Sequence, residues 1–346
     1  MSQLQSQTID WLRFPMAVTV VLLHSAALGV GSTHPVYSTL SIAIGRGFCR
    51  IAVPCFFLIS SFLFFTKLEQ KWDTRTWLDK LRKRSRTLLL PYLFWNIIAA
   101  FAIWGYRWFF AKKHGELYPS FFAHIKDQGG IWDAGDALPF DGPLWFIRYL
   151  ILFIIAAPLV WIFVKYLKIY GVSLLTLLFI AVGIVPEGLV LFTWGAWFRM
   201  EGRNILADFQ RVRWPALAIM LSTWILLTLA YRSHPVLYRI SSSLYILSGI
   251  VIVFLLAARG LSAGRLRVRP FLVQSSFFIF AAHNILILHD FSHWVILHVL
   301  PFHGEWMECI DLFMRPALAV LICLGLFGFM EKFTPKTLAL LTGGRG

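Results

Sequence analysis

Charged side chains are scarce in this 346-residue chain, where Asp, Glu, Lys and Arg together make up 14% of the residues. A typical soluble domain carries about 25%, so this chain has too few charges to cover a water-exposed surface. Apolar residues take their place, since 58% of the chain is hydrophobic and it holds 32 Phe and 15 Trp. The composition therefore argues against a soluble protein and predicts an integral membrane protein.

Cysteine is also rare, and its placement argues against a disulfide or zinc framework. The four cysteines show neither paired nor metal-type spacing and lie in or beside apolar segments: Cys49, Cys55, Cys309 and Cys323. Isolated cysteines of this kind behave as small hydrophobic residues. One metal-like pattern exists, because His289 and His293 are four residues apart with Asp290 adjacent. No third ligand is defined by spacing and no HExxH occurs, so we expect no metal site.

Apolar runs of the length that a bilayer requires dominate the chain. We expect ten of them, at about residues 10–30, 48–66, 87–108, 143–164, 171–186, 188–200, 214–231, 240–258, 271–290 and 312–331. The sixth is short and rich in Gly and Trp, which is typical of a broken or tilted span. No internal repeat and no soluble domain is evident. The sequence therefore predicts an all-α membrane protein with about ten transmembrane helices in a single domain over residues 1–346.

The positions of the basic residues predict the orientation in the membrane. If the N-terminus is cytoplasmic, the inside connections hold 21 of the 32 Lys and Arg residues. Positive charges gather on the cytoplasmic side of membrane proteins, so both termini are expected in the cytoplasm. The net charge of +15 is then mainly an orientation signal. Because it is spread over membrane-flanking loops, we expect membrane lipid and no nucleic acid as a partner.

Two ionisable side chains stand out in the first apolar run. Arg13 and His24 are 11 residues apart in the sequence, which is about three helical turns, so both face nearly the same way with a rise of roughly 16 Å between them. The predicted orientation places Arg13 near the cytoplasmic surface and His24 in the outer half. Ionisable groups inside a membrane are costly and commonly functional. From the residues alone, His24 is either a base or a buried histidine bonded to a neighbouring helix.

Further patterns follow in order along the chain. With the first pair they are Arg13-x10-His24, Arg50–Leu63, the basic run Leu81–Arg86 leading to Leu90-Pro91-Tyr92, Gly142–Ile147 and Ser276–His283. Together these motifs resemble the acyltransferase-3 family of integral membrane acyltransferases. Three features depart from the family pattern: Ser61 stands where the family usually has Gly, Lys83-x-x-Arg86 replaces Arg-x-x-Arg, and Pro143 stands where many members have His.

The resemblance implies acyl transfer, with acetyl-CoA as the expected donor on the cytoplasmic side. The expected acceptor is a hydroxyl of an envelope or extracellular polysaccharide or of its lipid-linked precursor, and the expected location is the bacterial inner membrane. His24 is then the candidate general base, because imidazole has a reference pKa near 6.5. Arg13 is either a snorkelling anchor or a contact to a donor phosphate or to the acyl carbonyl. Asp10, one turn earlier, is expected to orient it.

The densest group of cations is the expected dock for the phosphates of CoA. Its members are Arg82, Lys83, Arg84 and Arg86. The alternative is that these residues only set the topology, which any inside loop would do.

Acceptor-side residues are expected near the outer ends of the spans. Arg50 is either an acceptor contact or an interfacial anchor, and the same alternatives hold for the group Trp145, Arg148 and Tyr149. His283 is either a second catalytic or orienting histidine or a structural hydrogen-bonding group, and Asn284 beside it is an expected acceptor contact. The outer loop at about 109–142 either receives a hydroxylated substrate or forms a solvated cap.

Two other functional classes stay open at this stage. A secondary transporter also suits intramembrane Arg and His and a short Gly-containing span, although no internal repeat is present. A scaffold or accessory subunit of an envelope assembly would need none of this chemistry. Labelled acyl-CoA distinguishes the three, because only an acyltransferase releases CoA in the presence of an acceptor.

Overall fold

The computed structural model describes residues 1–127, 139–299 and 304–344, and within these ranges it contains helices and no strand. The helices and the short 3₁₀ or π segments (η) follow in the order α1 (Gln3–Ala27), η1 (Leu28–Gly31), α2 (Pro35–Ser41), η2 (Ile42–Gly47), η3 (Phe48–Ile51), α3 (Ala52–Phe64), α4 (Thr74–Arg84), η4 (Ser85–Leu89), α5 (Leu90–Lys113), α6 (Phe121–Asp127), η5 (Gly142–Leu144), α7 (Trp145–Ile155), α8 (Ala157–Ala181), α9 (Glu187–Met200), α10 (Ile205–Arg211), α11 (Arg213–Ala230), α12 (Pro235–Ser262), α13 (Pro270–Ala282), η6 (Ile287–Ser292), α14 (His293–Val299), α15 (Glu305–Phe333) and α16 (Pro335–Thr342).

Seven helical stretches of the described residues are long and apolar enough to cross a membrane, or eight if a bent pair counts as one span. This confirms the all-helical membrane class, although the count is lower than the ten expected. The run expected at 143–164 is divided at Ala156 between α7, with 11 residues, and α8. The run expected at 188–200 forms α9, whose 14 residues extend only about 21 Å against a hydrocarbon core of roughly 30 Å.

Helix α8 is not regular throughout. Its backbone leaves the helical conformation at Lys168, where φ is 48° and ψ is −139°. This break lies in the connection expected between the fourth and fifth apolar runs, at 165–170. Lysine therefore marks the end of an apolar segment here, as it commonly does where a chain meets the membrane surface.

The outer helices present apolar side chains outward. In α8 and α11 only 22% of the most apolar window is buried inside the protein. Leu159, Leu177 and Leu229 are 70%, 60% and 72% exposed. Large exposed apolar surfaces of this kind are unfavourable in water, whereas in a bilayer they contact acyl chains. The fold is therefore that of an integral membrane protein.

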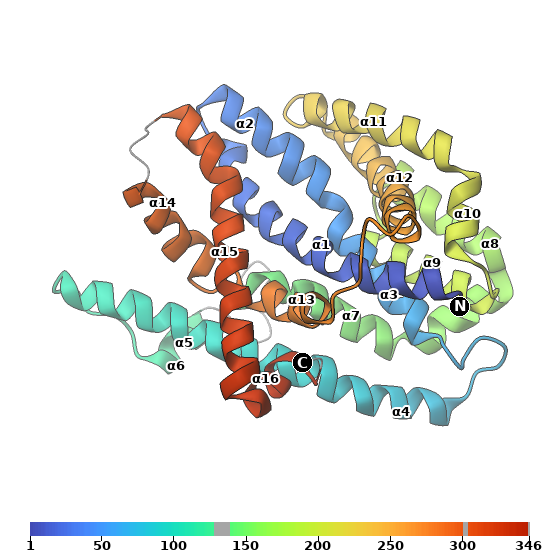
Figure 1. Cartoon of the computed structure of the whole chain (residues 1–346), viewed down its shortest axis with the longest axis horizontal. Coiled ribbons are helices and arrows are strands. Elements are labelled where there is room, and N and C mark those ends of the chain that lie inside the picture. The colour runs from blue at the N-terminus through green and yellow to red at the C-terminus, as the bar shows by residue number, and fades with distance from the viewer. Residues whose placement is uncertain (128–138, 300–303, 345–346) are drawn as a thin grey trace.

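Helix α1 runs through the middle of the molecule and contacts α3, α12, α13 and α15 (Figure 1). Its buried residues include Ile9, Leu12, Met16 and Val20, which recur at helical spacing. The buried polar side chains of this helix therefore lie close to neighbouring helices. That arrangement makes α1 the element around which a site can be built.

Helices α3 and α9 pack against each other with very close backbones. A Cβ placed on Gly195 would lie 2.3 Å from the carbonyl oxygen of Leu58 and 2.9 Å from the Cβ of Ser61. Ser61, which stands where the related family usually has Gly, is fully buried here. The close approach is therefore provided by the glycine on α9, which lets serine occupy the facing position on α3.

The chain breaks between α13 and η6. Leu286 has a left-handed backbone with φ of 57°, and the helices Pro270–Ala282 and Ile287–Val299 are bent by 85°. The single long run expected at 271–290 is thus two helices joined by a sharp turn. The turn brings His289 back toward α1 and α15, whereas His283 lies before it, at the end of α13, which packs against α1.

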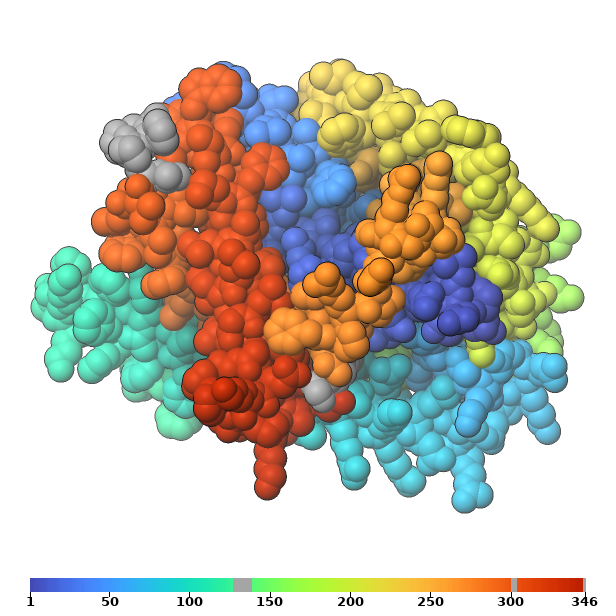
Figure 2. Space-filling view, viewed as in Figure 1, coloured from blue at the N-terminus to red at the C-terminus, as the bar shows by residue number. Residues whose placement is uncertain are grey.

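Several segments that carry basic residues share one face of the molecule. Figure 2 shows the N-terminal turn of α1 (dark blue), the connection from α3 to α4 (light blue) and the connection from α12 to α13 (orange) on the same face. The cytoplasmic position of both termini stays a prediction.

Candidate functional site

Arg13 and His24 both lie on α1, which is continuous from Gln3 to Ala27. The guanidinium of Arg13 is 3.4 Å from the carboxylate of Asp10, so the predicted contact one turn away is present. His24, which is half-buried, faces His283, and the two ring centroids are 5.3 Å apart. The structure therefore brings the predicted base on the first helix next to the predicted second histidine, 259 residues later in the sequence.

The tautomer of His283 follows from its hydrogen bond. Its Nδ1 is 3.0 Å from the backbone carbonyl oxygen of Ile279, and a carbonyl can only accept, so Nδ1 carries the hydrogen. Nε2 then holds a lone pair, and it is buried without a hydrogen-bond partner among the described residues. A buried imidazole nitrogen in this state can accept a proton or a hydrogen bond from a substrate hydroxyl.

A third imidazole, that of His289, lies within electrostatic range of His24 and His283. Behind it Arg315 contacts His293, with 2.9 Å between the guanidinium and Nδ1, and also pairs with the buried Asp311. From the sequence, His289 stood out only as part of a metal-like pair with His293, because nothing in the spacing announced the left-handed turn at Leu286. The sequence offered only a general indication of its position, because a histidine inside an apolar run needs a hydrogen-bonding partner.

A cavity of about 590 Å³ opens beside α1, a size within the usual range for small-molecule sites. We call it the donor cavity. Five helices (α1, α3, α4, α7 and α13), the short segment η4 and the segment after α16 line it. Its apolar and aromatic walls come from α3, α7 and α13, and they include Phe56, Ile59, Phe146, Ile147, Phe277 and Phe280. Such a lining suits an extended chain with few polar atoms.

The rest of the donor-cavity lining is strongly basic. Four cations line the cavity, namely Arg13, Lys80, Lys83 and Arg84, and no Asp or Glu is among its described lining residues. Lys80 donates to the carbonyl oxygen of Phe64 at 2.8 Å. Arg82 and Arg86, which the sequence groups with Lys83 and Arg84, do not line the cavity. Arg82 is exposed and pairs with Asp79 at 3.6 Å.

Helix α7 presents two faces, and only one of them belongs to the donor cavity. Phe146, Ile147 and Leu150 line it. The expected acceptor residues of this helix are Trp145, Arg148 and Tyr149, and they share the opposite face because they are spaced by three and four residues. The rings of Trp145 and Tyr149 are 5.9 Å apart. Sequence reasoning thus named the face of α7 that points away from the cavity and missed the face that lines it.

The other expected acceptor contacts lie apart from each other. The guanidinium of Arg50 pairs with Glu187, at the start of α9, at 2.7 Å. Asn284 follows His283 directly, and its amide nitrogen would be 3.8 Å from a Cβ on Gly142. Asn284 is therefore close to the histidine pair, whereas Arg50 already has a carboxylate partner.

Asp141, beside Gly142, is a buried carboxylate in the outer loop that was expected either to receive a hydroxylated substrate or to form a solvated cap. It is 1% exposed, and neither of its carboxylate oxygens has a hydrogen-bond partner among the described residues. Burial raises the pKa of Asp141 well above its ordinary value. In the sequence, the sign of this burial is the apolar run that begins directly after Asp141 and Gly142. Residues 128–138 of that loop, which include the acidic residues Asp133 and Asp136, lie outside the described residues.

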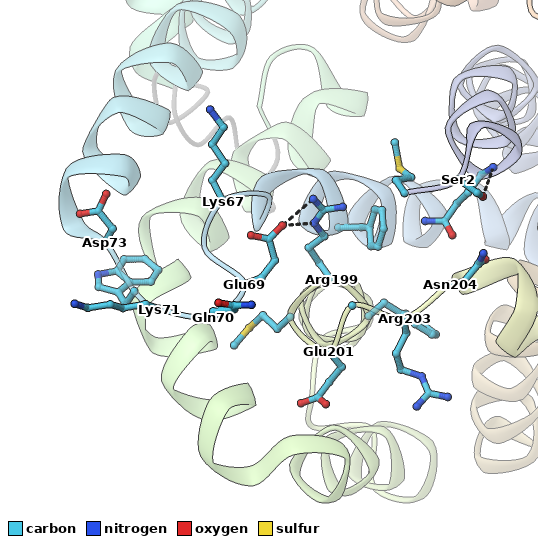
Figure 3. A pocket seen from close by; sticks show the side chains of 17 residues that line it. Ser2, Lys67, Glu69, Gln70, Lys71, Asp73, Arg199, Glu201, Arg203 and Asn204 are labelled. Carbon is cyan, nitrogen blue, oxygen red and sulfur yellow. Dashed lines mark hydrogen bonds and ion pairs between the residues drawn. The ribbon is translucent and has the colours of Figure 1, made fainter.

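A second, larger cavity of about 1060 Å³ lies between the start of α1, the connection from α3 to α4, and the connection from α9 to α10. We call it the polar cavity. It also holds four cations, but acidic side chains accompany them, and its charged lining residues are Lys67, Lys71, Arg199, Arg203, Glu69, Asp73 and Glu201. Figure 3 shows Glu69 and Arg199 meeting, while Lys67 and Lys71 extend away from them.

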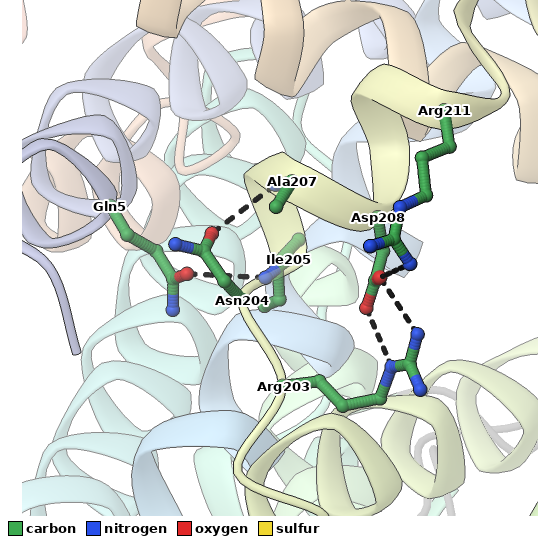
Figure 4. Close-up of polar contacts among 7 residues, drawn as sticks. All are labelled: Gln5, Arg203, Asn204, Ile205, Ala207, Asp208 and Arg211. Carbon is green, nitrogen blue, oxygen red and sulfur yellow. Dashed lines mark hydrogen bonds and ion pairs between the residues drawn. The ribbon is translucent and has the colours of Figure 1, made fainter.

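The wall of the polar cavity is a structural junction (Figure 4). Arg203 forms two hydrogen bonds with Asp208, of 2.6 and 2.7 Å. The buried side chain of Gln5 accepts from the backbone N–H of Ile205 at 3.1 Å and so ties α1 to α10. The side chain of Asn204 caps α10 by accepting from the N–H of Ala207 at 3.2 Å. These polar groups are used to hold the fold together.

Comparison with known proteins agrees with the geometry. A protein-family model described as an acyltransferase domain, that of the acyltransferase-3 family, matches residues 6–330. The chain is similar to the succinoglycan biosynthesis protein ExoH of Rhizobium meliloti (strain 1021), with 27% identity over 332 residues that cover 88% of this chain and 82% of ExoH. No solved structure matches it. Because the family model spans nearly the whole chain, this integral membrane protein belongs to the acyltransferase-3 family.

Proposed function

We propose that the chain is a membrane O-acyltransferase that moves an acyl group, acetyl in the simplest case, from cytoplasmic acyl-CoA to a hydroxyl of a glycan at the outer side. The observation that supports it most is the donor cavity. It combines four cations, no acidic lining residue among those described, and an aromatic wall on α13 that ends one turn before His283. Phosphates of CoA suit the cations, and the apolar walls suit its pantetheine arm and acyl group.

The histidine pair supplies the proton chemistry of this proposal. His24 accepts the proton of the acceptor hydroxyl as its oxygen bonds to the acyl carbon and the carbon–sulfur bond breaks. The proton then passes to the sulfur of the departing CoA, so the reaction is balanced without another reactant. His283, with its lone pair on Nε2, either holds the acceptor hydroxyl or orients His24. General base catalysis of this kind contributes about 10²- to 10⁴-fold.

Arg13 and the basic lining residues have the donor role in this proposal. The guanidinium of Arg13 binds a phosphate or the acyl carbonyl, and Lys80, Lys83 and Arg84 bind phosphates of the nucleotide. The rise of roughly 16 Å from Arg13 to His24 on a straight helix is comparable to an extended pantetheine arm. This distance allows one helix to contact both ends of the donor.

The acceptor and location also belong to the proposal. ExoH is a protein of succinoglycan biosynthesis by its name, which favours a polysaccharide or its lipid-linked precursor as the acceptor of this chain. The positive-inside pattern favours cytoplasmic termini and, in a bacterium, the inner membrane. On this orientation the donor cavity opens to the cytoplasm, and the histidine pair lies between it and the outer side.

A single assay tests the proposal. The purified protein is incubated in lipid nanodiscs with acetyl-CoA labelled in the acetyl group and with a surface glycan fraction. Release of CoA that depends on the glycan, together with label on the glycan, is the expected result. Solute accumulation in liposomes without CoA turnover would instead show a transporter. Mass spectrometry of surface glycans from cells with and without the gene then identifies the acceptor.

A further inference from the structure

Three phenylalanine rings from three different helices meet in the wall of the donor cavity. Phe56 lies on α3, Phe146 on α7 and Phe280 on α13, and all three line the cavity. The ring centroids are 5.8 Å apart for Phe56 and Phe146, 6.4 Å for Phe56 and Phe280, and 5.8 Å for Phe146 and Phe280. These are ordinary contact distances for aromatic pairs, so the three rings form a closed aromatic triangle.

The aromatic triangle lies next to the histidine pair. Val273, Phe277 and Phe280 line the cavity on successive turns of α13, and His283 follows one turn after Phe280 but is not among the lining residues. A rise of about 4.5 Å separates Phe280 from His283 along the helix axis. His283 in turn contacts His24. The triangle therefore lies where the cavity approaches the imidazoles.

Two of the three rings are held firmly, and the third, that of Phe56, is partly buried. Phe146 and Phe280 are 5% and 4% exposed, and tightly packed rings in a close-packed interior cannot move aside without disturbing their neighbours. Phe146 also packs edge-on against Phe57 at 4.7 Å. The inner end of the cavity thus has a fixed size and an apolar surface.

We infer that the triangle of Phe56, Phe146 and Phe280 packs against the acyl group of the donor and limits its length. This inference rests on the proposed function, since the acyl group must reach the histidine pair while the phosphates contact the cations of the cavity. We therefore expect the protein to accept acyl groups of two to four carbons. A longer chain would have to displace a buried ring. Rejection of one extra methylene by an apolar pocket amounts to about 10- to 200-fold.

The test is a series of donors with acyl chains of two, four, six and eight carbons. Wild-type protein is expected to prefer the two shortest donors in kcat/KM. Phe146→Ala and Phe280→Ala should each raise the ratio of six-carbon to two-carbon kcat/KM by at least about tenfold. Phe146→Trp, which fills space, should lower the four-carbon rate relative to the two-carbon rate.

Phe153→Ala is the matched control. This ring lies on the same helix as Phe146 and packs against Phe57 and Phe192, each at 5.4 Å, but it does not line the donor cavity. It should leave the chain-length ratio unchanged, although it removes an aromatic ring of equal size. The stability of Phe153→Ala and Phe146→Ala is measured as well. If both variants lose stability but only Phe146→Ala changes the chain-length ratio, the change in the ratio is an effect on specificity and not a consequence of lost packing.

Binding gives a second readout that does not need turnover. The dissociation constants of the same four donors are measured by calorimetry for wild type, Phe56→Ala and Phe153→Ala. A shift toward longer chains in Phe56→Ala alone supports the inference. Unchanged ratios and unchanged binding preferences in every triangle variant overturn it. Failure of wild type to bind or turn over any acyl-CoA would instead overturn the proposed function.

Discussion

The two cavities near the predicted cytoplasmic face contain the same number of basic side chains but differ in what accompanies them. In the polar cavity Arg199 pairs with Glu69 and Arg203 pairs with Asp208, while Lys67 and Lys71 form no ion pair among the described residues. In the donor cavity Lys83 and Arg84 have no carboxylate partner among the described residues, and only Arg13 has one, Asp10. A cation whose charge is already balanced gains little from a phosphate, and acidic residues line only the larger cavity, so this difference favours the smaller one for the proposed donor.

The contrast shows why a count of basic residues is a poor guide to a binding site. All the basic residues that line either cavity contribute equally to the positive-inside signal. Whether a basic side chain is free to bind a ligand depends on whether an acidic side chain lies beside it in the folded protein. Arg199 and its partner Glu69 are 130 residues apart in the chain, so their pairing could not be read from spacing.

The largest expected effect comes from removing the proposed base of the histidine pair. His24→Ala should lower acyl transfer by about 10²- to 10⁴-fold, because the group proposed to accept the hydroxyl proton is lost. Insertion and folding should be retained, since the ring is only half-buried. Glycan-dependent release of CoA measures the effect. His298→Ala, which changes an exposed histidine bonded to its own helix at Trp294, is the control, and wild-type turnover by His24→Ala would rule out the base.

Charge reversal in the two cavities tests the comparison directly. Lys83→Glu or Arg84→Glu should raise the KM for acyl-CoA by at least about tenfold, because hydrogen bonds to charged groups contribute roughly 1.5–3 kcal/mol. Lys71→Glu, in the polar cavity, should leave that KM unchanged. Initial rates over a range of donor concentrations give both values. If Lys71→Glu and Lys83→Glu had equal effects, the assignment of the donor to the smaller cavity would fail.

A conservative change at Arg13 should have a moderate effect. Arg13→Lys keeps the charge but loses the planar fork that binds phosphate with two parallel hydrogen bonds, so donor KM or turnover should worsen by about 3- to 10-fold. The measurement is the same kinetic series. Arg82→Lys is its control, because Arg82 is exposed outside the cavity. An Arg13→Lys variant with unchanged kinetics would leave Arg13 as an anchor of the helix only.

The smallest expected effect concerns the junction beside the polar cavity. The Arg203 guanidinium lowers the pKa of Asp208, so this pair stabilises the fold above the ordinary carboxyl pKa, and the contribution is lost as the pH falls through the lowered value. Asp208→Asn should cost roughly 0.5–1 kcal/mol at pH 7, since the pair is partly exposed, and less near pH 3. Thermal unfolding in detergent measures the difference.

A matched substitution in a second ion pair tests whether the close contact between Arg203 and Asp208, with its two hydrogen bonds, matters for stability. Asp79→Asn removes the looser contact between Asp79 and Arg82. The side chain of Arg82 is 83% exposed and that of Asp79 is 66% exposed. This substitution should change the midpoint of unfolding less than Asp208→Asn does. Both variants should keep the wild-type KM for acyl-CoA, because neither residue lines the donor cavity.

Much of the fold could be predicted from the chain alone. Apolar runs at spanning length predicted the helices, and the positions of most spans agree with the structure. The count was too high because periodicity and hydropathy do not show where a run is divided, as at Ala156, or where it is too short, as in α9. Backbone conformation at single residues decides such breaks.

The sequence by itself determined that this is a helical membrane protein and that Arg13 and His24 share one helix face, because composition and the helical repeat are local properties. Only the tertiary structure decided which residues meet that face. The left-handed turn at Leu286 brings His289 back toward α1, and the packing of α13 on α1 sets His283 beside His24. Helix packing also selects Phe146 rather than Trp145 for the donor cavity. Pairing of charges across distant segments then leaves Lys83 and Arg84 unbalanced. These outcomes depend on contacts between residues far apart in the chain, which spacing does not encode.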